Sequence, residues 1–147
     1  MKLNLQYSAG LFDGEGTIGI IPLVQRKHSL RWSYQARVTL VIRERFIVEA
    51  FEETFGGRVA LDRPSTEKHS SYWRWFASGV IASDFCKIIS QYMHLKRKQA
   101  EILIEFQEAK LAKVKESSYT KLSDSEYENY TRLYRLMRET NQKGVGK

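Results

Sequence analysis

The chain has 147 residues with a single cysteine, Cys86, and carries a formal net charge of +7. This length fits one domain with a substantial core, and one cysteine excludes a disulfide framework. No segment reaches the run of about eighteen apolar residues that spans a membrane, and the N-terminus lacks the layout of a secretory signal. We therefore expect an intracellular protein, in a prokaryotic cytoplasm or an organelle, without a membrane partner. Its positive charge favours an anionic partner, most simply a nucleic acid.

The first predicted element is a short helix over residues 5–13 that ends in two carboxylates set among glycines. Residues 8–16 read SAGLFDGEG, and Asn4 is a suitable N-cap. The glycines on either side of Glu15 predict the end of the helix. Asp13 and Glu15 would then face the negative end of the helix dipole, which is unfavourable by about 0.3–1 kcal/mol each. Such breaks of local rules tend to occur at functional sites, and a bound divalent cation would reverse the sign of the interaction.

The rest of the chain predicts two strands, a helix, two strands and three further helices. The strands are expected at 17–28, 32–41, 58–63 and 72–78, and the helices at 43–55, 81–92, about 96–115 and from 123 onward. Pro22 indicates an edge or a bulge in the first strand, and Ser123–Glu126 (SDSE) is a capping box. The apolar stripe of the third helix is predicted to contain Ile81, Phe85, Ile88, Ile89 and Tyr92. We expect a single domain over residues 1–140 and a frayed tail over 141–147.

Residues 8–16 resemble the signature helix of the LAGLIDADG homing endonucleases. An ungapped alignment keeps Ala9, Gly10, Leu11, Asp13 and Gly16 and replaces the second aspartate with Glu15. The order of predicted elements is also similar to one whole copy of the family's domain. The resemblance implies an α+β fold of αββαββα order, in which helices back a four-stranded antiparallel sheet that binds double-stranded DNA. The motif occurs once, which in this family implies a homodimer, and we expect Ala9, Gly10 and Asp13 at its interface.

The resemblance also implies metal-dependent hydrolysis of phosphodiester bonds. One Glu15 from each protomer, with the Gly14 carbonyl, would hold Mg²⁺ or Mn²⁺ at the dimer axis, because oxygen ligands suit a hard cation. Residues 95–100 read LKRKQA and resemble the segment before the family's fourth helix, where a lysine reaches the active site. Lys96 is the matching position, and it would stabilise the charge that develops on the scissile phosphate.

One position departs from the family's pattern. A polar glutamine often found at the end of the second strand has no counterpart, since the alignment places Leu40 there, and Arg43 or Arg45 would have to compensate. Glu15 and Lys96 favour a homing endonuclease that makes double-strand breaks at a long, near-palindromic target. The missing glutamine favours the alternative, a non-cleaving module of the same fold that serves as an RNA maturase or a DNA-binding regulator. A purely structural homodimer would need neither the carboxylates nor the charge.

Alternation along the second strand predicts which sheet face binds DNA. Arg31, Ser33, Gln35 and Arg37 share one side, and Trp32, Tyr34, Ala36 and Val38 share the other. A merely solvated face is the plainer interpretation for an antiparallel sheet, but the resemblance and the net charge favour a DNA-binding face. Gln35 and Arg37 are the best candidates for reading bases. The predicted DNA contacts are Lys27, Arg31, Ser33, Gln35, Arg37, Arg63, Arg74, Arg97 and Lys98. The pattern leaves open which face of its strand holds Arg74.

Overall fold

The computed structural model describes residues 1–23, 33–116 and 122–145. Its elements follow the order α1 (Leu5–Glu15), β1 (Gly16–Leu23), β2 (Ser33–Ile42), α2 (Arg45–Phe55), β3 (Arg58–Arg63), β4 (Tyr72–Ser78), α3 (Gly79–Ile89), a 3-10 turn η1 (Ser90–Tyr92), α4 (Arg97–Glu116) and α5 (Asp124–Val145). This is the predicted α+β order, and all four predicted strands are present. The expected continuation of the first strand over 24–28 lies outside the described residues.

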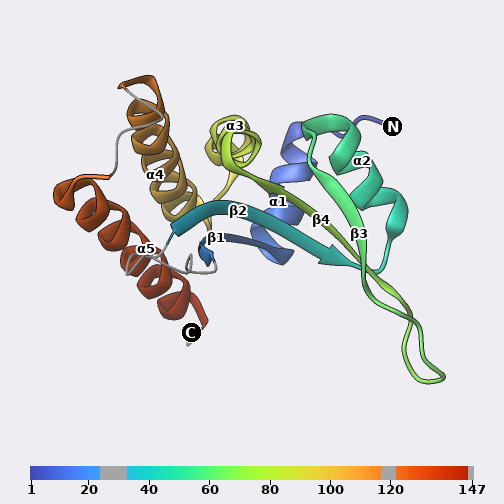
Figure 1. Cartoon of the computed structure of the whole chain (residues 1–147). Helices are drawn as coiled ribbons and strands as arrows, with labels where there is room; N and C mark the ends of the chain where they lie inside the picture. The colour runs from blue at the N-terminus through green and yellow to red at the C-terminus, as the bar shows by residue number, and fades with distance from the viewer. Residues whose placement is uncertain (24–32, 117–121, 146–147) are drawn as a thin grey trace.

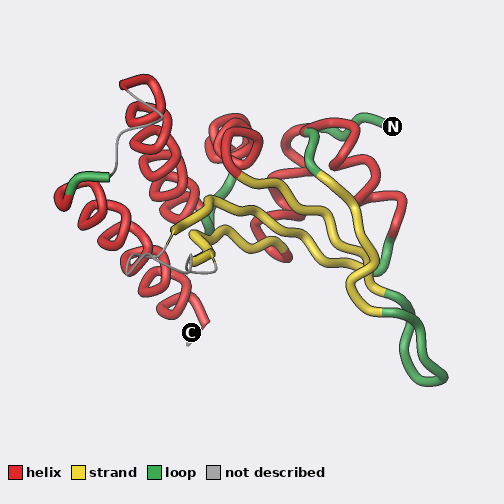
Figure 2. Tube along the Cα trace, viewed as in Figure 1, coloured by secondary structure: helices red, strands yellow, loops and turns green. Residues whose placement is uncertain are grey.

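The four strands form one antiparallel sheet in the order β1-β2-β4-β3 (Figure 2). β1 is an edge strand, which explains how it accommodates Pro22, a residue without a backbone N–H. Along β2, Tyr34, Ala36, Val38 and Leu40 are all buried, whereas the alternate residues are exposed or partly exposed. The predicted alternation is therefore confirmed over residues 33–38. One face of the sheet packs against the helices, and the other face is open (Figure 1).

Aromatic side chains fix α1 against the sheet. Phe12 is fully buried and meets Phe85 of α3 edge-to-face, with ring centroids 4.9 Å apart, and Trp75 of β4 at 6.3 Å. Phe51 of α2 packs on the same Trp75 at 5.1 Å, and the indole N–H of Trp75 donates to the Gly56 carbonyl at 2.8 Å. Pairs of this kind each contribute about 0.5–1.5 kcal/mol beyond the burial of area. Because Phe12 faces the sheet, the opposite side of α1 points outward.

The third helix, α3, buries a stripe that matches the prediction at Phe85 and Ile89 but not at Ile81 and Ile88. Ala82, Phe85, Cys86 and Ile89 are buried, whereas Ile81 and Ile88 are 43% and 41% exposed. The prediction was wrong at these two isoleucines because the small side chains of Ala82 and Cys86 form the face that packs inward. Burial raises the pKa of the Cys86 thiol to about 12, so this cysteine is unreactive at neutral pH.

The last helix extends further than predicted. α5 continues to Val145, past the start of the expected frayed tail, and the Asn141 side-chain amide donates to the Ile18 carbonyl of β1 at 3.1 Å. Its inward residues Tyr130, Leu133 and Met137 are buried, as the sequence predicts. None of the helices within the described ranges is both long enough and apolar enough to cross a bilayer.

The end of α1 requires a glycine at position 16. A Cβ atom there would lie 2.4 Å from the ring of Phe12, whereas a Cβ at Gly14 would meet nothing within 4 Å. Because the Phe12 ring is enclosed by the core, we expect Gly16→Ala to lower the free energy of unfolding by about 1–3 kcal/mol. Urea denaturation measures this change. The matched control is Gly14→Ala, which should raise stability by about 0.5–1 kcal/mol because alanine favours a helix; equal effects of the two variants would contradict the prediction.

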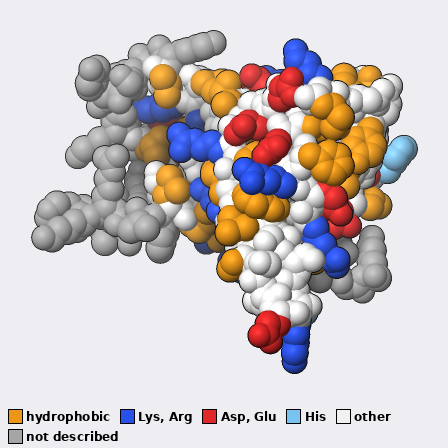
Figure 3. Space-filling view, turned by 90° about the vertical axis from the view of Figure 1, so that its right-hand side faces the viewer, with side chains coloured by type: hydrophobic (Ala, Val, Ile, Leu, Met, Phe, Trp, Pro, Cys, Tyr) orange, Lys and Arg blue, Asp and Glu red, His pale blue; other side chains and the backbone are white. Residues whose placement is uncertain are grey.

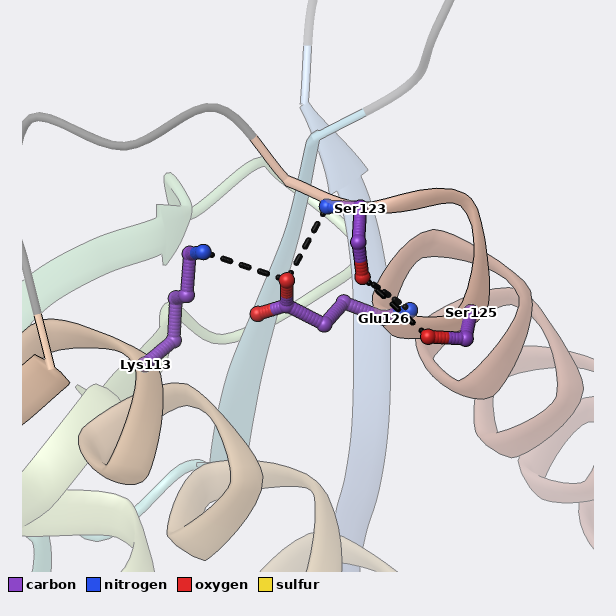
Figure 4. A network of polar contacts seen from close by, with 4 residues as sticks. All are labelled: Lys113, Ser123, Ser125 and Glu126. Carbon is purple, nitrogen blue, oxygen red and sulfur yellow. Dashed lines mark hydrogen bonds and ion pairs between the residues drawn. The ribbon is translucent and has the colours of Figure 1, made fainter.

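The capping box at the start of α5 also joins that helix to α4 (Figure 4). A Glu126 carboxylate oxygen accepts hydrogen bonds from the Ser123 N–H at 3.0 Å and from the Lys113 ammonium at 3.1 Å. In return, the Ser123 hydroxyl accepts the Glu126 N–H at 3.2 Å. These contacts lower the pKa of Glu126 from its usual 4.5. The hydrogen bond from the Ser123 backbone contributes most, and the interaction with Lys113 contributes less.

This lowered pKa predicts a pH-dependent stabilisation. A carboxyl whose pKa falls on folding stabilises the native state above the unfolded pKa, and the effect is lost as the pH falls through the folded pKa. We therefore expect Glu126→Gln to lower Tm at pH 7 and to match the wild type at pH 2.5. Glutamine can still serve in a capping box, so the comparison isolates the charge. A difference in Tm that is the same at both pH values would contradict this expectation.

Candidate functional site

The C-terminal turn of α1 presents an open carboxylate. Asn4 caps the start of the helix, its side-chain oxygen accepting the Tyr7 N–H at 3.0 Å, and Gly16 follows the last helical residue. The helix ends at Glu15, two residues later than predicted, because Gly14 remains helical. Gly14 and Glu15 are both exposed. Within the described part of the chain, no hydrogen bond or ion pair engages the Glu15 side chain, so it is free to bind a ligand.

Asp13, in the same turn, is used inside the protomer. It is only 7% exposed, and its two carboxylate oxygens accept the backbone N–H groups of His94, Leu95 and Lys96 at 2.8–3.0 Å. Burial by itself opposes ionisation of this carboxyl. The hydrogen bonds from Leu95, His94 and Lys96 outweigh burial, with help from the Lys96 charge, and the pKa of Asp13 is lowered from 3.8. The unfavourable position of this anion at the end of α1 is thus offset by contacts with the start of α4.

Lys96 reaches the same turn from the other side. Its ammonium donates a hydrogen bond to the Asp13 backbone carbonyl, at the negative end of the α1 dipole. Residues 13–15 and Lys96 are 81 or more positions apart in the sequence, yet the fold brings them to one end of α1. Lys96, one of the two predicted catalytic residues, is therefore bound to the helical turn that carries the other, Glu15. Within the described residues of one protomer, no group of three or more His, Cys, Asp or Glu side chains could hold a metal ion.

The outward side of α1 differs in part from the predicted interface. Gly10 is exposed, and a Cβ atom there would meet nothing within 4 Å, so another backbone could approach it closely. Tyr7, three residues before Gly10 on the same helix, is 50% exposed, and Leu95, whose N–H is bound by Asp13 at the end of α1, is 74% exposed. Ala9, in contrast, is fully buried in its own protomer, and Asp13 is occupied as described. The structure thus leaves Gly10 available for an interface and gives Ala9 and Asp13 roles inside the chain.

The open face of the sheet carries most of the described residues predicted to bind DNA. Ser33 is exposed, and the Arg37 guanidinium donates to the Gln35 side-chain oxygen at 3.0 Å. Arg74, which the sequence left unassigned, lies opposite Val41 of β2 and on this open face, since its neighbour Trp75 is fully buried. Arg74 approaches Asp62 at 3.8 Å. Lys27 and Arg31 lie outside the described residues.

Two arginines of this face hold buried donors with no partner. The Nε atoms of Arg37 and Arg74 are buried and make no hydrogen bond within the described part of the structure. Unsatisfied buried donors are rare in native proteins, and each calls for an explanation. The buried Nε atoms cannot themselves reach a ligand, but both guanidinium groups belong to the open face, and their positive charge suits a ligand that supplies acceptors, such as a phosphate or a guanine edge.

A cluster that the sequence did not reveal lies at one end of the same face. The Nε of Arg43 donates to the Tyr72 hydroxyl at 3.3 Å, and the Arg63 guanidinium lies 4.4 Å from the centroid of the Tyr72 ring. No carboxylate of the described residues pairs with either arginine. Knowledge of the strand register would have predicted this cluster. Arg63 pairs with Tyr72, and Arg43 comes directly after Ile42, which pairs with Trp73.

The remaining residues singled out in the sequence have different surroundings. Arg45, expected to compensate for the missing glutamine, pairs with Glu49 at 2.7 Å and lies over the Trp73 ring. Its helix α2 lies at the right of Figure 1, and Figure 3 shows acidic, basic and hydrophobic side chains interspersed on that side of the molecule. Arg97 donates to the carbonyls of Ser90 and Gln91 at 3.1 and 2.9 Å, so its guanidinium closes the end of η1. Lys98 is exposed.

The position aligned with the family's glutamine is part of the core. Leu40 is fully buried and pairs with Gly16 of β1. Its side chain therefore cannot reach a molecule on the open face. Arg43 and Arg45, the residues expected to compensate, are engaged by Tyr72 and Glu49 respectively.

Known proteins share this sequence pattern and this fold. A family model described as LAGLIDADG endonuclease matches residues 8–110, well over half of the chain. The homing endonuclease I-CvuI, solved in complex with its target in the presence of calcium, is 18% identical, with a TM-score of 0.70; the match covers 97% of this chain and 83% of that chain.

Two further structures show the same likeness. The archaeal intron-encoded homing endonuclease I-Vdi141I, complexed with DNA, is 15% identical, with a TM-score of 0.73 and coverage of 92% of this chain and 82% of that chain. The homing endonuclease I-TnaI is 13% identical, with a TM-score of 0.65; the match covers 98% of this chain and 99% of that chain. A comparison with curated proteins gives no match. At these identities the likeness to solved structures establishes the fold.

Proposed function

The chain belongs to the LAGLIDADG endonuclease family, and we propose that it is a metal-dependent endonuclease that cleaves double-stranded DNA at a specific, near-palindromic site as a homodimer. The observation that supports this proposal is that the Lys96 ammonium is bound to the carbonyl of Asp13, two residues before the exposed Glu15 at the end of α1. A carboxylate that can hold a metal ion and a lysine ammonium in the same region are groups that suit phosphodiester hydrolysis. The open face of β2 and β4, with its arginines, supplies the surface on which DNA would lie.

The residues at the end of α1 fit a hard divalent cation. The Glu15 carboxylate and the Gly14 carbonyl are oxygen donors in an exposed turn, and such ligands suit Mg²⁺ or Mn²⁺. When bound, the metal would activate water and stabilise the leaving oxygen. Glu15 and Gly14 would hold it, and Lys96 would stabilise the negative charge on the phosphate that is attacked. Two protomers would each contribute one Glu15, with the outward side of α1 at Gly10 forming the dimer contact.

Cleavage of a randomised DNA library in the presence of Mg²⁺ tests this proposal. We expect a small set of related sequences to be cut on both strands, with half-sites about one helical turn apart, since a two-fold symmetric dimer reads a palindrome. Binding of DNA without cleavage in Mg²⁺ or Mn²⁺ would favour the alternative, a non-cleaving module of the same fold. The burial of Leu40 at the position of a usual polar residue is the observation that favours this alternative.

The arginines around Tyr72 are expected to contact phosphates rather than bases. Arg43 has no carboxylate partner among the described residues, so its positive charge is available to a ligand. We expect Arg43→Ala to make the dependence of log K on log salt shallower by about 0.9 per lost phosphate contact. Fluorescence anisotropy at several salt concentrations measures this slope. The control is Arg45→Ala, whose guanidinium is already paired with Glu49; the same slope change in both variants would contradict the assignment.

A further inference from the structure

We propose that Asp13 is a positioning residue that holds the Lys96 side chain in place for the reaction. This inference rests on the proposed function, because it assigns Asp13 a role through a lysine that acts on phosphate. The Asp13 side chain is buried and is not among the residues of the open sheet face. The hydrogen bonds it makes to described residues all go to the segment 94–96, which leads into α4.

The Asp13 carboxylate accepts hydrogen bonds from three consecutive backbone N–H groups. Oδ2 of Asp13 accepts the His94 N–H at 2.8 Å, both oxygens accept the Leu95 N–H at 3.0 and 2.9 Å, and Oδ1 accepts the Lys96 N–H at 2.8 Å. Charge-assisted bonds of this length are stronger than neutral ones, and together they fix the direction in which the chain enters α4. The first residue of that helix is Arg97, so Lys96 stands immediately before it.

Lys96 is held to Asp13 at both of its ends. Its backbone N–H is bound by the Asp13 carboxylate, and its ammonium is bound by the Asp13 carbonyl. This closes a loop that contains the whole lysine side chain and leaves it few alternative rotamers. Because Gly14 and Glu15 follow Asp13 directly, the same contacts fix the lysine relative to the proposed metal ligands. Side chains whose geometry is fixed in advance are more effective in catalysis than mobile ones.

A simple cap for α4 is the competing explanation for these contacts. A cap would stabilise the protein, but its loss would not change the cleavage rate through the Lys96 side chain. Asn4 provides the matched control, because its side chain caps α1 at the Tyr7 N–H and does not contact the Lys96 segment. Either substitution removes a hydrogen-bond acceptor at the start of a helix, but only Asp13 is hydrogen-bonded to Lys96.

A double-mutant cycle separates the two explanations. We expect Asp13→Asn to slow single-turnover cleavage of a saturating DNA target about 10- to 100-fold, as loss of supporting residues does elsewhere. In the Lys96→Ala background the same substitution should change the rate less than twofold, because residues that act as a unit are not additive. Asn4→Ala should change the rate little in either background. Equal effects of Asp13→Asn with and without Lys96 would overturn the proposal.

A second measurement does not depend on cleavage. We expect the ¹³C relaxation of the Lys96 side-chain methylenes to show a more mobile lysine in Asp13→Asn than in the wild type or in Asn4→Ala. An unchanged lysine would overturn the inference even if the wild type cuts DNA. If the wild type cuts no DNA, the proposed function and the positioning role of Asp13 in catalysis both fail, while relaxation still reports whether Asp13 holds the lysine. If Asp13→Asn does not fold, Asp13→Glu, which keeps the charge but moves it by one methylene, enters both experiments in its place.

Discussion

Glu15→Gln is expected to reduce DNA cleavage by at least about a thousandfold, equivalent to about 4 kcal/mol of transition-state stabilisation. The variant removes the negative charge of the proposed metal ligand and keeps the shape of the side chain. Because the Glu15 side chain is exposed and makes no hydrogen bond or ion pair with the described residues, its replacement should leave the fold and its stability unchanged. The measurement is the single-turnover cleavage rate in Mg²⁺ on a sequence that the wild type cuts.

DNA binding by the same variant supplies the control. In Ca²⁺, the affinity of Glu15→Gln for the target should stay within about tenfold of the wild type, because the arginines of the open face are intact. The exposed carboxylate Glu49, which pairs with Arg45 away from this turn, offers a matched comparison, and Glu49→Gln should cut at the wild-type rate. Retained cleavage by Glu15→Gln would show that the metal site lies elsewhere.

Gly10→Leu is expected to separate the proposed dimer while leaving each protomer folded. A Cβ atom at position 10 meets nothing within 4 Å in the isolated protomer, and leucine favours a helix over glycine by about 0.8–1 kcal/mol. A leucine on both copies would, however, keep the two α1 backbones apart. We expect sedimentation or sizing chromatography to show a dimer for the wild type and a monomer for the variant. The loss of the dimer should also abolish cleavage of both DNA strands, because a monomer bound to DNA would supply only one Glu15.

The control for Gly10→Leu places the same leucine on another exposed helical position. Glu52 of α2 is exposed and outside the proposed interface, so Glu52→Leu should remain a dimer. A wild-type chain that is monomeric at micromolar concentration would contradict the homodimer, and the site of metal binding would then need ligands from a single protomer.

The amino-acid sequence by itself determined the elements of the fold and the positions of the main chemical groups. Alternation along β2 assigned Ser33, Gln35 and Arg37 to the open face, and the capping box at Ser123–Glu126 marked the start of α5. The motif around Glu15 identified the end of α1 as the candidate site. These features are readable because side-chain direction in a strand, the capping of a helix and the need for glycine at its end are set by neighbouring residues.

Only the tertiary structure decided what several of these residues do. The sequence predicted Asp13 as an interface residue, and only the fold showed the backbone N–H groups of His94, Leu95 and Lys96, 81–83 positions away, bound to its carboxylate. Arg74 and Arg43 could be assigned only when strand register placed them against Val41 and Tyr72. Burial of Ala9, and of Ala82 and Cys86 in place of the larger Ile81 and Ile88, likewise depends on which helix packs on which sheet face. Local periodicity carries no information on such partners, because contacts between distant segments follow from packing of the whole chain.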